Sequence, residues 1–348
     1  MNKIVLIGGG IISACTAHYL QELDPKLQLV IIEKASGKAG GFLSRVMCSS
    51  STALKKLSQK SFDLHSDLAE KFNGEVNYDY RRVCVSTRDY VEKDHLTFKK
   101  INDTKIGDVN NSAQLNPSSF TNYLVRQNKQ LTVKIGDFLD LVKINGKITG
   151  IKYQQEDKIL FEECDKVVFC TGPWTNQIFD KIGLECPVTI VPHCAESIVV
   201  KSDHSSKEML FIEVCKGNEV RSLEVYPRPN STIYLCGDGQ PFGIEEDIPR
   251  PLLDPTEVQP NTSFLNEILK LAKMVELGLE EKSVFKMQAC FVPYSHSGAP
   301  YIGETHVENV YLAAGHGCWG ILNAPATGLA LSELIVHGAS KLLNSFGM

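Results

Sequence analysis

The first 33 residues have the order of a dinucleotide-binding βαβ unit. Residues 3–7 (KIVLI) are typical of a buried parallel strand, and residues 29–32 (LVII) repeat that pattern. Between them, Gly8-Gly9-Gly10-Ile11-Ile12-Ser13 spells G-x-G-x-x-S and leads into a helix over 14–20. The second strand ends at an acid, Glu33. This arrangement predicts a site for NAD or FAD. The alternative is an ordinary strand, turn and helix that binds no ligand, but in that case no acid is required at the end of the second strand.

Each residue type in this unit suits one part of such a ligand. Gly8 allows the tight turn, and Gly10 lets the backbone at Ile11 and Ile12 approach a pyrophosphate. The helix N-terminus there places the positive end of its dipole next to that anion. The carboxylate of Glu33 is placed to accept hydrogen bonds from a ribose. These residues alone leave the choice between NAD and FAD open.

The composition narrows the class of protein. At 348 residues the chain is long enough for two lobes, and a net charge of -5 gives no reason to expect nucleic acid or an anionic membrane as partner. The eleven cysteines are scattered with no C-x-x-C pair, which favours a reducing compartment and no metal site. We therefore predict a cytoplasmic protein. The apolar start is too short for a signal peptide, and residues 326–336 are too short to span a bilayer and contain Glu333, so we expect no transmembrane segment.

Local patterns predict further elements. Leucines on one face indicate a helix over 52–73, and residues 264–279 are also amphipathic. Asn116-Pro117 is a cap followed by a first-turn proline and predicts another helix. Alternating Tyr and Val over 78–85 predict a strand. Asn145-Gly146 predicts a type I′ hairpin turn.

The order of these elements predicts an α/β fold (α+β overall). A Rossmann-type cofactor domain is expected to carry an inserted, mostly antiparallel substrate domain. We assign residues 1–80, 125–185 and 305–348 to the cofactor domain, and residues 81–124 and 186–304 to the substrate domain.

A second glycine motif, Gly315-His316-Gly317-Cys318-Trp319-Gly320, follows an apolar strand near the C-terminus. Too few residues follow Gly320 for a second strand and a ribose-binding acid, so we exclude a second dinucleotide site. The motif predicts a turn that directs a helix N-terminus at one ligand group, such as the edge of a flavin that becomes negative on reduction. The alternative is a plain helix cap.

Several blocks occur together in one order along nearly the whole chain. They are residues 8–13 with Glu33, 35–41, 167–174, 226–229, 298–303, 315–316 and 320–328. In these blocks the chain resembles the D-amino-acid oxidase superfamily of FAD-dependent oxidoreductases, the glycine oxidase and sarcosine oxidase group. The amino-acid sequence of residues 36–43 and 316–328 resembles more closely still a eukaryotic subgroup that includes the fungal "topoisomerase damage affected" oxidoreductases.

The resemblance implies FAD, bound without a covalent link. Gly40 and Gly41 are expected beside the pyrophosphate or the flavin, and residues 134–138 beside the adenine. The full set of predicted cofactor-binding residues is Gly8, Gly10, Ile11, Ile12, Glu33, Lys34, Gly40, Gly41, Phe42, Asp137, Phe138, Gly172, Trp174, Gly315, Gly320, Ile321 and Leu322.

The departures from the family concern the substrate. Glycine-oxidase-like enzymes carry an arginine that pairs with the substrate carboxylate, and this chain has Cys318 there. A second family arginine is replaced at Val292-Pro293, and a family aspartate is replaced by Ser297. An arginine is the usual partner of a carboxylate. We therefore predict oxidation of a C–N bond in a secondary or modified amine or amino acid, with dioxygen or another electron acceptor.

Three residues are candidates for catalysis. His316 could tune the flavin or the amine, or simply cap backbone groups. Trp319 could form a wall of the substrate pocket or pack in the core. Arg228, in Tyr-Pro-Arg-Pro, could bind an anionic substrate group or tie the two lobes together.

An alternative function is a flavin-bound regulatory or trafficking protein with little turnover. The proline-rich, acidic segment 241–262 predicts a long loop that could dock a protein partner, although a lid or a plain connector is the simpler interpretation. The resemblance alone also implies peripheral association with endosomes.

Overall fold

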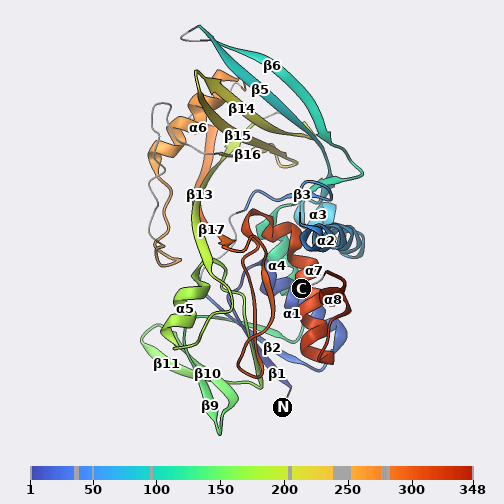
Figure 1. Ribbon diagram of the computed structural model, residues 1–348, viewed down its shortest axis with the longest axis vertical. Coiled ribbons are helices and arrows are strands. Elements are labelled where there is room, and N and C mark those ends of the chain that lie inside the picture. The colour runs from blue at the N-terminus through green and yellow to red at the C-terminus, as the bar shows by residue number, and fades with distance from the viewer. Residues whose placement is uncertain are drawn as a thin grey trace.

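The structure of the protein, a computed structural model, describes residues 2–34, 39–48, 51–94, 97–202, 206–237, 252–275, 277, 279 and 283–346. Figure 1 shows an elongated molecule with one large sheet at each end. Two long strands of the upper sheet, β13 (Ile190–Lys201) and β17 (Val284–Ser295), run down to the middle of the molecule.

The lower sheet has six strands in the order β18-β19-β12-β1-β2-β8. Their bounds are Tyr301–Glu304 (β18), Val310–Ala314 (β19), Lys166–Phe169 (β12), Lys3–Ile7 (β1), Gln28–Glu33 (β2) and Leu131–Ile135 (β8). All neighbours pair in parallel except β18 and β19. With α1 (Ile11–Leu23), β1 and β2 form the βαβ unit predicted from the sequence.

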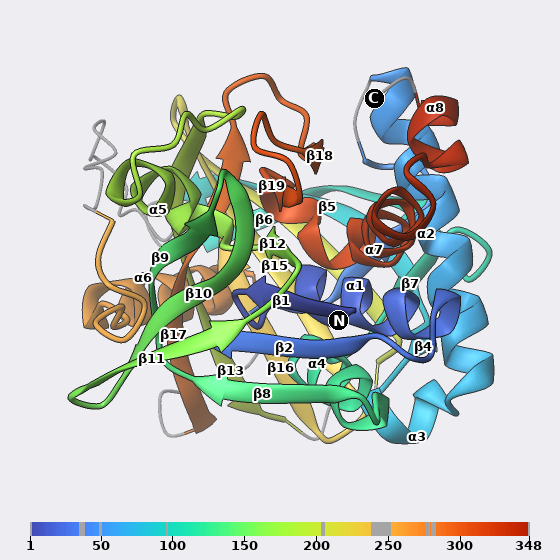
Figure 2. The ribbon, with the colours of Figure 1, turned by 90° about the horizontal axis from the view of Figure 1, so that it is seen from below.

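Both faces of this sheet are covered, as its continuous apolar strands require. Ile4 and Leu6 pack against α1, α2 (Thr52–Lys71) and α7 (Gly320–His337) on one face. Val5 and Ile7 pack on the other face against α5 (Thr175–Lys181) and a small antiparallel sheet. That small sheet consists of β9 (Asp137–Ile144), β10 (Lys147–Gln155) and β11 (Lys158–Glu163). Figure 2 shows it with α5 on the left, and α2 and α7 on the right.

The upper sheet has seven strands in the order β17-β13-β16-β15-β14-β5-β6. The further bounds are Thr232–Gly237 (β16), Glu219–Arg228 (β15), Glu208–Lys216 (β14), Cys84–Asp94 (β5) and Thr97–Gly107 (β6). All neighbours are antiparallel except β14 and β5. Helix α6 (Thr262–Met274) packs on one face through an apolar cluster, which leaves the opposite face for the site between the two large sheets.

Smaller elements lie at the middle of the molecule. A three-stranded sheet consists of β3 (Phe42–Ser44), β7 (Ser112–Gln114) and β4 (Arg81–Arg82). The helices are α3 (Gly74–Tyr78), α4 (Pro117–Gln127) and, near the C-terminal end, α8 (Lys341–Phe346). Two 3-10 turns lie at Gly172–Trp174 and Gly317–Trp319. Figure 1 shows β3, α3 and α4 close to the start of α7.

Two local predictions are confirmed. The Asn116 side chain accepts a hydrogen bond from Ser119 N at 3.2 Å and begins α4. Asn145 and Gly146 both have positive φ and join β9 to β10, as a type I′ turn requires. The fold class is also as predicted, with a largely parallel sheet and a mostly antiparallel one.

Two local predictions are wrong. Residues 78–85 are not one strand, because Tyr78 ends α3 and its ring packs against Phe120 at 4.9 Å. The left-handed residues Asn73 and Asp79 close that short helix at both ends. Helix α6 ends at Met274 rather than near 279, since Leu277 N donates to Ala272 O at 3.0 Å and turns the chain.

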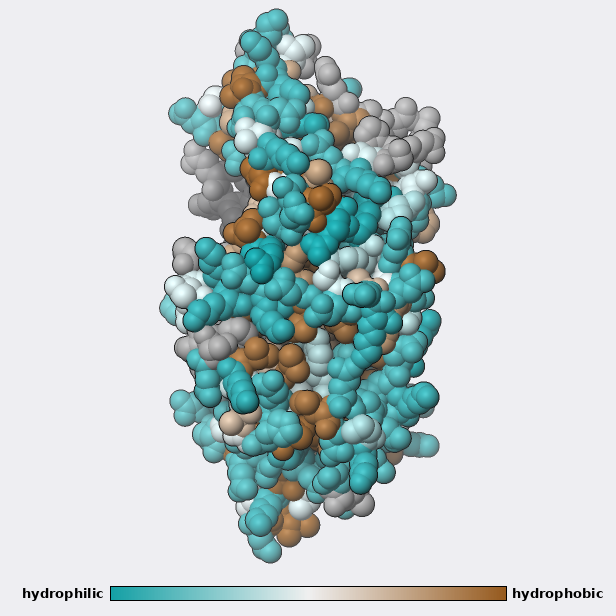
Figure 3. All heavy atoms as spheres, turned by 90° about the vertical axis from the view of Figure 1, so that its right-hand side faces the viewer, coloured by the Kyte–Doolittle hydropathy of each residue, from teal (hydrophilic) through white to brown (hydrophobic). Residues whose placement is uncertain are grey.

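The chain boundaries of the two domains stay a prediction. Strand β18 pairs with β19 although the predicted boundary at residue 304 separates them. Within the described residues, one helical stretch, Gly317–His337, is long and apolar enough to cross a membrane, but 67% of its apolar window is buried inside the protein. Figure 3 shows a largely hydrophilic face over this side of the molecule, without a continuous apolar band, which suits a core helix.

Candidate functional site

Three parallel strands of the lower sheet end at the same edge, and each leads into a turn with a left-handed glycine. Gly8 follows β1 with φ 95°, Gly172 follows β12 with φ 53°, and Gly315 follows β19 with φ 89°. Ligands of α/β sheets bind beyond the carboxyl ends of parallel strands. This edge is therefore the candidate cofactor site.

Gly8 and Gly10 are needed for different reasons. A Cβ on Gly8 would lie 2.5 Å from the carbonyl oxygen of Cys170, so Gly8 is required by packing within the protein itself. A Cβ on Gly10 would meet nothing within 4 Å. Gly10 is also the N-cap of α1, and no side chain caps this helix. The first-turn N–H groups at Ile11 and Ile12 therefore face open space, as a pyrophosphate requires.

The acid predicted to bind a ribose is in place. The Glu33 carboxylate accepts a hydrogen bond from Gly9 N–H at the end of β2. The Ser13 hydroxyl donates to the carbonyl of Gly8, so it fills the position of the third motif glycine without disturbing the turn.

The turn before α7 presents a second helix N-terminus to this edge. No side chain caps α7, and its first turn contains no acid. The His316 imidazole is buried and lies 3.0 Å from Thr327 Oγ1, on the second turn of the helix. Burial lowers the pKa of His316 to about 4, so the ring is neutral near pH 7. Helices α1 and α7 pack tightly, since a Cβ on Gly328 would lie 2.6 Å from Cys15 C.

These features fit FAD. Two uncapped helix starts, an acid at the end of β2 and open space at Gly10 and Gly172 lie along one edge. An anionic pyrophosphate suits the start of α1, and the flavin ring suits the start of α7. Phe138 does not offer its ring to the adenine, because that ring packs in the core against Phe169 at 5.3 Å.

A cluster of charges links the cofactor edge to the predicted loop. Lys34 Nζ forms ion pairs with Asp137 and with Asp254, the latter at 2.6 Å. Trp174 Nε1 donates to the carbonyl of Leu253 at 2.8 Å. Residues 252–261 are thus a connector tied to the lower lobe, while residues 241–251 of the predicted loop lie outside the described residues.

An aromatic cluster lies where the upper sheet meets β3 and the α7 turn. Phe42 packs against Phe211, Tyr226 and Trp319, with ring centroids 5.5, 6.2 and 6.2 Å apart. A Cβ on Gly40 would lie 2.7 Å from the Tyr226 ring, so a glycine is needed for the turn to pass beneath it. Gly41 is needed as well, because its Cβ would lie 2.0 Å from Leu115 O.

A carboxylate, Glu224, lies on the same face of the upper sheet. Tyr226 donates its hydroxyl hydrogen to Glu224 Oε2, and Cys236 Sγ lies 3.3 Å from the same oxygen. Burial and then the charge of Glu224 raise the pKa of Cys236 well above its usual value, so the thiol stays protonated. Sequence reasoning did not select Glu224.

The predicted catalytic residues occupy different positions. Trp319 packs beside Phe42 at the aromatic cluster, as a pocket wall would. His316 points to Thr327 in the core, which supports an anchoring role. Arg228 Nη2 donates to Gly40 O at 3.3 Å, which supports the tie between the lobes. Ile321 and Leu322 are buried in α7, where Ile321 O accepts from His65 Nε2 at 2.9 Å.

The sequence held a signal for the residues that were missed. Glu224 and Tyr226 precede the predicted residue Arg228 by four and two positions on one strand, so all three share a face. Tyr294 likewise follows from alternation along β17, and its ring lies 3.0 Å from a Cβ built on Gly317. Asp254 had no local signal, because only the fold brings it to Lys34.

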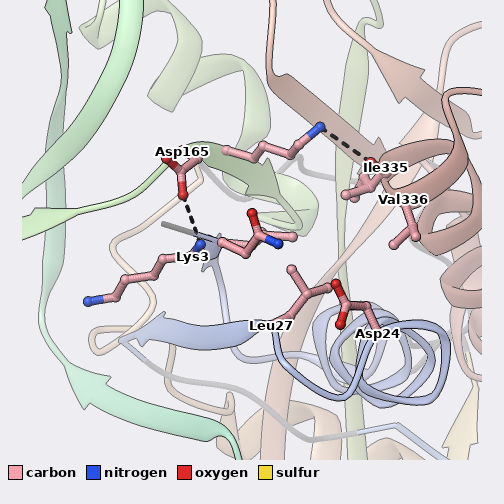
Figure 4. Close-up of a pocket in the computed structure, with 9 residues that line it drawn as sticks. Lys3, Asp24, Leu27, Asp165, Ile335 and Val336 are labelled. Atoms are coloured by element: carbon pink, nitrogen blue, oxygen red, sulfur yellow. Dashed lines mark hydrogen bonds between the residues drawn. The ribbon is translucent and has the colours of Figure 1, made fainter.

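A pocket away from this edge does not belong to the site. It has a volume of about 190 Å³ and lies at the opposite, amino ends of β1 and β12, beside the end of α7 (Figure 4). There the Asp165 carboxylate accepts from Lys3 N at 2.9 Å, so its polar groups bond to each other.

Comparison with known proteins places the chain among flavin enzymes. A family model described as "FAD dependent oxidoreductase" (DAO) matches residues 3–334. "Putative oxidoreductase C1F5.03c" of Schizosaccharomyces pombe is 26% identical, over 99% of this chain and 96% of that protein. "Putative oxidoreductase TDA3" of Saccharomyces cerevisiae is 23% identical, over 97% and 92%. The crystal structure of glycine oxidase from Bacillus cereus superimposes with a TM-score of 0.73 at 18% identity, over 99% and 98% of the two chains. The resemblance predicted from the sequence is confirmed.

Proposed function

Because the chain belongs to the DAO family of FAD-dependent oxidoreductases, we propose that it oxidises a C–N bond of a secondary or otherwise modified amine, with dioxygen as electron acceptor. The proposal is supported by the turn before α7, where the resemblance to glycine-oxidase-like enzymes implies Cys318 in place of their carboxylate-binding arginine. Without that arginine, a simple α-amino acid loses its main partner.

FAD held at this edge would supply a two-electron acceptor for the carbon next to the substrate nitrogen. The net reaction would convert the amine, water and dioxygen into a carbonyl compound, a smaller amine and hydrogen peroxide. The chain contributes position and a restricted pocket. The start of α1 would hold the pyrophosphate and the start of α7 would stabilise the flavin edge that becomes negative on reduction. The aromatic cluster around Phe42 would exclude water from the reacting carbon.

We further propose that FAD is held without a covalent link. The cradle already described supplies backbone N–H groups and the Glu33 carboxylate, which suffice for reversible binding. Acid precipitation of the purified yellow protein should leave FAD in the supernatant. Yellow colour retained in the pellet would overturn this part.

The main experiment is anaerobic mixing of the FAD-loaded protein with single compounds, following the loss of visible flavin absorbance. Secondary amines should reduce the flavin and, on admission of air, produce hydrogen peroxide. Fast reduction by glycine or D-alanine would contradict the argument from Cys318. Reduction by NADH alone would place the chain in another class of flavoenzyme.

The free thiols support a reducing location for this enzyme. None of the eleven cysteines forms a disulfide in the structure, which fits the cytoplasmic location predicted from the sequence. Cell fractionation with a tagged full-length chain tests it, and recovery in an oxidising compartment would contradict it.

A further inference from the structure

Glu224 lies on the face of the upper sheet that looks toward the cofactor edge. It shares that face of β15 with Tyr226, whose ring is in contact distance of Gly40. The charge of Glu224 also reaches the α7 turn. Burial, followed by the neighbouring Cys318 and Glu224, raises the pKa of Tyr294 to about 12, and Tyr294 is hydrogen-bonded to Cys318. Glu224 therefore projects from the upper sheet toward the turn before α7.

Among the described residues, no positive side chain balances this carboxylate. The donors described there, Tyr226 and Cys236, are neutral and both reach Oε2. In the part of the chain that the structure describes, no lysine or arginine forms an ion pair with Glu224 and no side chain donates to Oε1.

An arginine of this strand, Arg228, interacts with groups other than Glu224. Arg228 lies on the same face, but its guanidinium is over the ring of Tyr234 at 5.1 Å and donates to Gly40 O. Burial lowers the pKa of Arg228, and the groups that oppose this shift are Tyr234 and Asp79, not Glu224. Glu224 is thus separate from this cation.

The surroundings of Glu224 are aromatic and neutral. Tyr226 stacks on Tyr234 with centroids 5.7 Å apart, and Phe42 and Trp319 lie beyond Tyr226 toward the α7 turn. A half-buried carboxylate without a counter-ion is costly, and a cation is the ligand that removes this cost. Aromatic ring faces stabilise the same kind of ligand, especially one that carries methyl groups.

We propose that Glu224 binds a cationic nitrogen of the substrate, so that the substrate class is an amine with a second positively charged nitrogen and no carboxylate. This inference rests on the proposed function for the reacting C–N bond. Glu224 recognises the far nitrogen, while the hydrogen bond from Tyr226 holds the carboxylate in place. The same site that lacks an arginine at Cys318 carries the opposite charge at Glu224.

The test uses two compounds that share one reacting end. N-methylputrescine and 4-methylaminobutanoate have the same N-methylamine and chain length, but the first ends in an ammonium and the second in a carboxylate. Steady-state hydrogen peroxide formation in air gives kcat and KM for each, and anaerobic mixing shows whether each compound reduces the flavin. Isothermal titration of the protein with its FAD already reduced by dithionite, in the absence of air, with each compound and with spermidine, gives binding without turnover.

The wild-type protein should prefer N-methylputrescine by about a hundredfold in kcat/KM. Glu224→Gln should raise KM for that diamine about tenfold or more and change kcat little, because the reacting end is untouched. Glu224→Asp should restore part of the affinity, and Glu224→Arg should reverse the preference toward 4-methylaminobutanoate. The control Glu213→Gln removes an exposed carboxylate from the neighbouring strand β14 and should leave both constants unchanged.

Each outcome separates the two proposals. Binding of the diamines that Glu224→Gln weakens, without any flavin reduction, supports the assignment of Glu224 and overturns the oxidase reaction. Reduction by both compounds with equal KM, or tighter binding of 4-methylaminobutanoate, overturns the assignment while the oxidase reaction stands. No binding of the diamines or spermidine also overturns it. FAD content and thermal unfolding check that each variant is folded. If Glu224→Gln does not fold, Glu224→Asp and Glu224→Arg test the assignment in its place.

Discussion

The guanidinium of Arg228 donates a hydrogen bond from Nη2 to the carbonyl of Gly40 at 3.3 Å. This contact joins β15 of the upper sheet to the turn before β3, next to the cofactor edge. The guanidinium also lies over the Tyr234 ring at 5.1 Å. The hydrogen bond ties the two lobes together, the ring contact fixes the guanidinium on the upper sheet, and neither leaves Arg228 directed at a substrate.

Arg228→Met is therefore expected to destabilise the protein without changing which substrate it takes. Arg228 is partly buried, and a lost hydrogen bond from such a charged group costs up to about 1.5–3 kcal/mol of unfolding free energy. Denaturant unfolding measures that loss, and Arg228→Lys should recover part of it. The kcat/KM ratio of N-methylputrescine to 4-methylaminobutanoate should stay the same. A selective loss of the carboxylate compound would show that Arg228 binds an anionic group after all.

Gly10→Val should abolish FAD binding while the apoprotein remains folded. The new side chain enters space that no protein atom occupies within 4 Å, so it excludes the ligand rather than the chain. We expect FAD affinity to fall about a hundredfold or more, measured by quenching of flavin fluorescence. Gly8→Val is the matched contrast, because its Cβ would lie 2.5 Å from Cys170 O at a φ of 95°. That variant should lower the apoprotein Tm as well; equal stability of both variants would contradict this distinction.

The protein should lose stability as the pH falls from 6.5 toward 4. Burial lowers the folded-state pKa of His65 and of His316 to about 4, while an unfolded histidine titrates near 6.5. In this window the unfolded chain binds protons that the folded chain does not, so acid favours unfolding. At pH 5 each histidine should contribute about 2 kcal/mol to the loss.

Denaturant unfolding at pH 7 and pH 5 checks this dependence. Because His65→Asn or His316→Asn also removes a hydrogen bond, the difference between the two pH values is the informative quantity, and each variant should reduce it. The exposed His337 is the control, and His337→Asn should leave the difference unchanged. An undiminished pH dependence in both buried-site variants would refute the assignment.

Asp254→Asn should loosen the connector over 252–261 without unfolding the protein. The Lys34–Asp254 pair is about one-third exposed, so its loss should cost less than about 1 kcal/mol of unfolding free energy. Amide hydrogen exchange should nevertheless speed up in residues 252–258, because the ion pair is gone while the Trp174–Leu253 hydrogen bond and the apolar packing around Trp174 remain. Asp157→Asn, in the exposed turn between β10 and β11, should change neither quantity. Unchanged exchange in Asp254→Asn would show that the ion pair does not hold the connector.

Much of the cofactor edge could be predicted because its signals are local. The turn glycine Gly8, the helix start at Gly10 and the acid Glu33 lie within one βαβ unit, where sequence spacing fixes spatial order. The hairpin at Asn145-Gly146 was equally accessible, since left-handed backbone conformations favour these two residue types. Tyr78 was mistaken for a strand residue because alternation of aromatic residues over a few positions does not distinguish a strand from a short helix packed on Phe120.

The sequence by itself determined the strand, turn and helix order that prepares a place for FAD. Its resemblance to glycine-oxidase-like enzymes predicts that Cys318 stands where those enzymes carry an arginine. Only the tertiary structure decided that Glu224 faces that turn. Alternation along β15 puts Glu224 and Tyr226 on one face, but the order of the sheet and the packing of α6 on its other face decide that this face looks toward the cofactor edge. Contacts such as Lys34 with Asp254 have the same origin, because pairing between distant segments depends on the packed core rather than on local spacing.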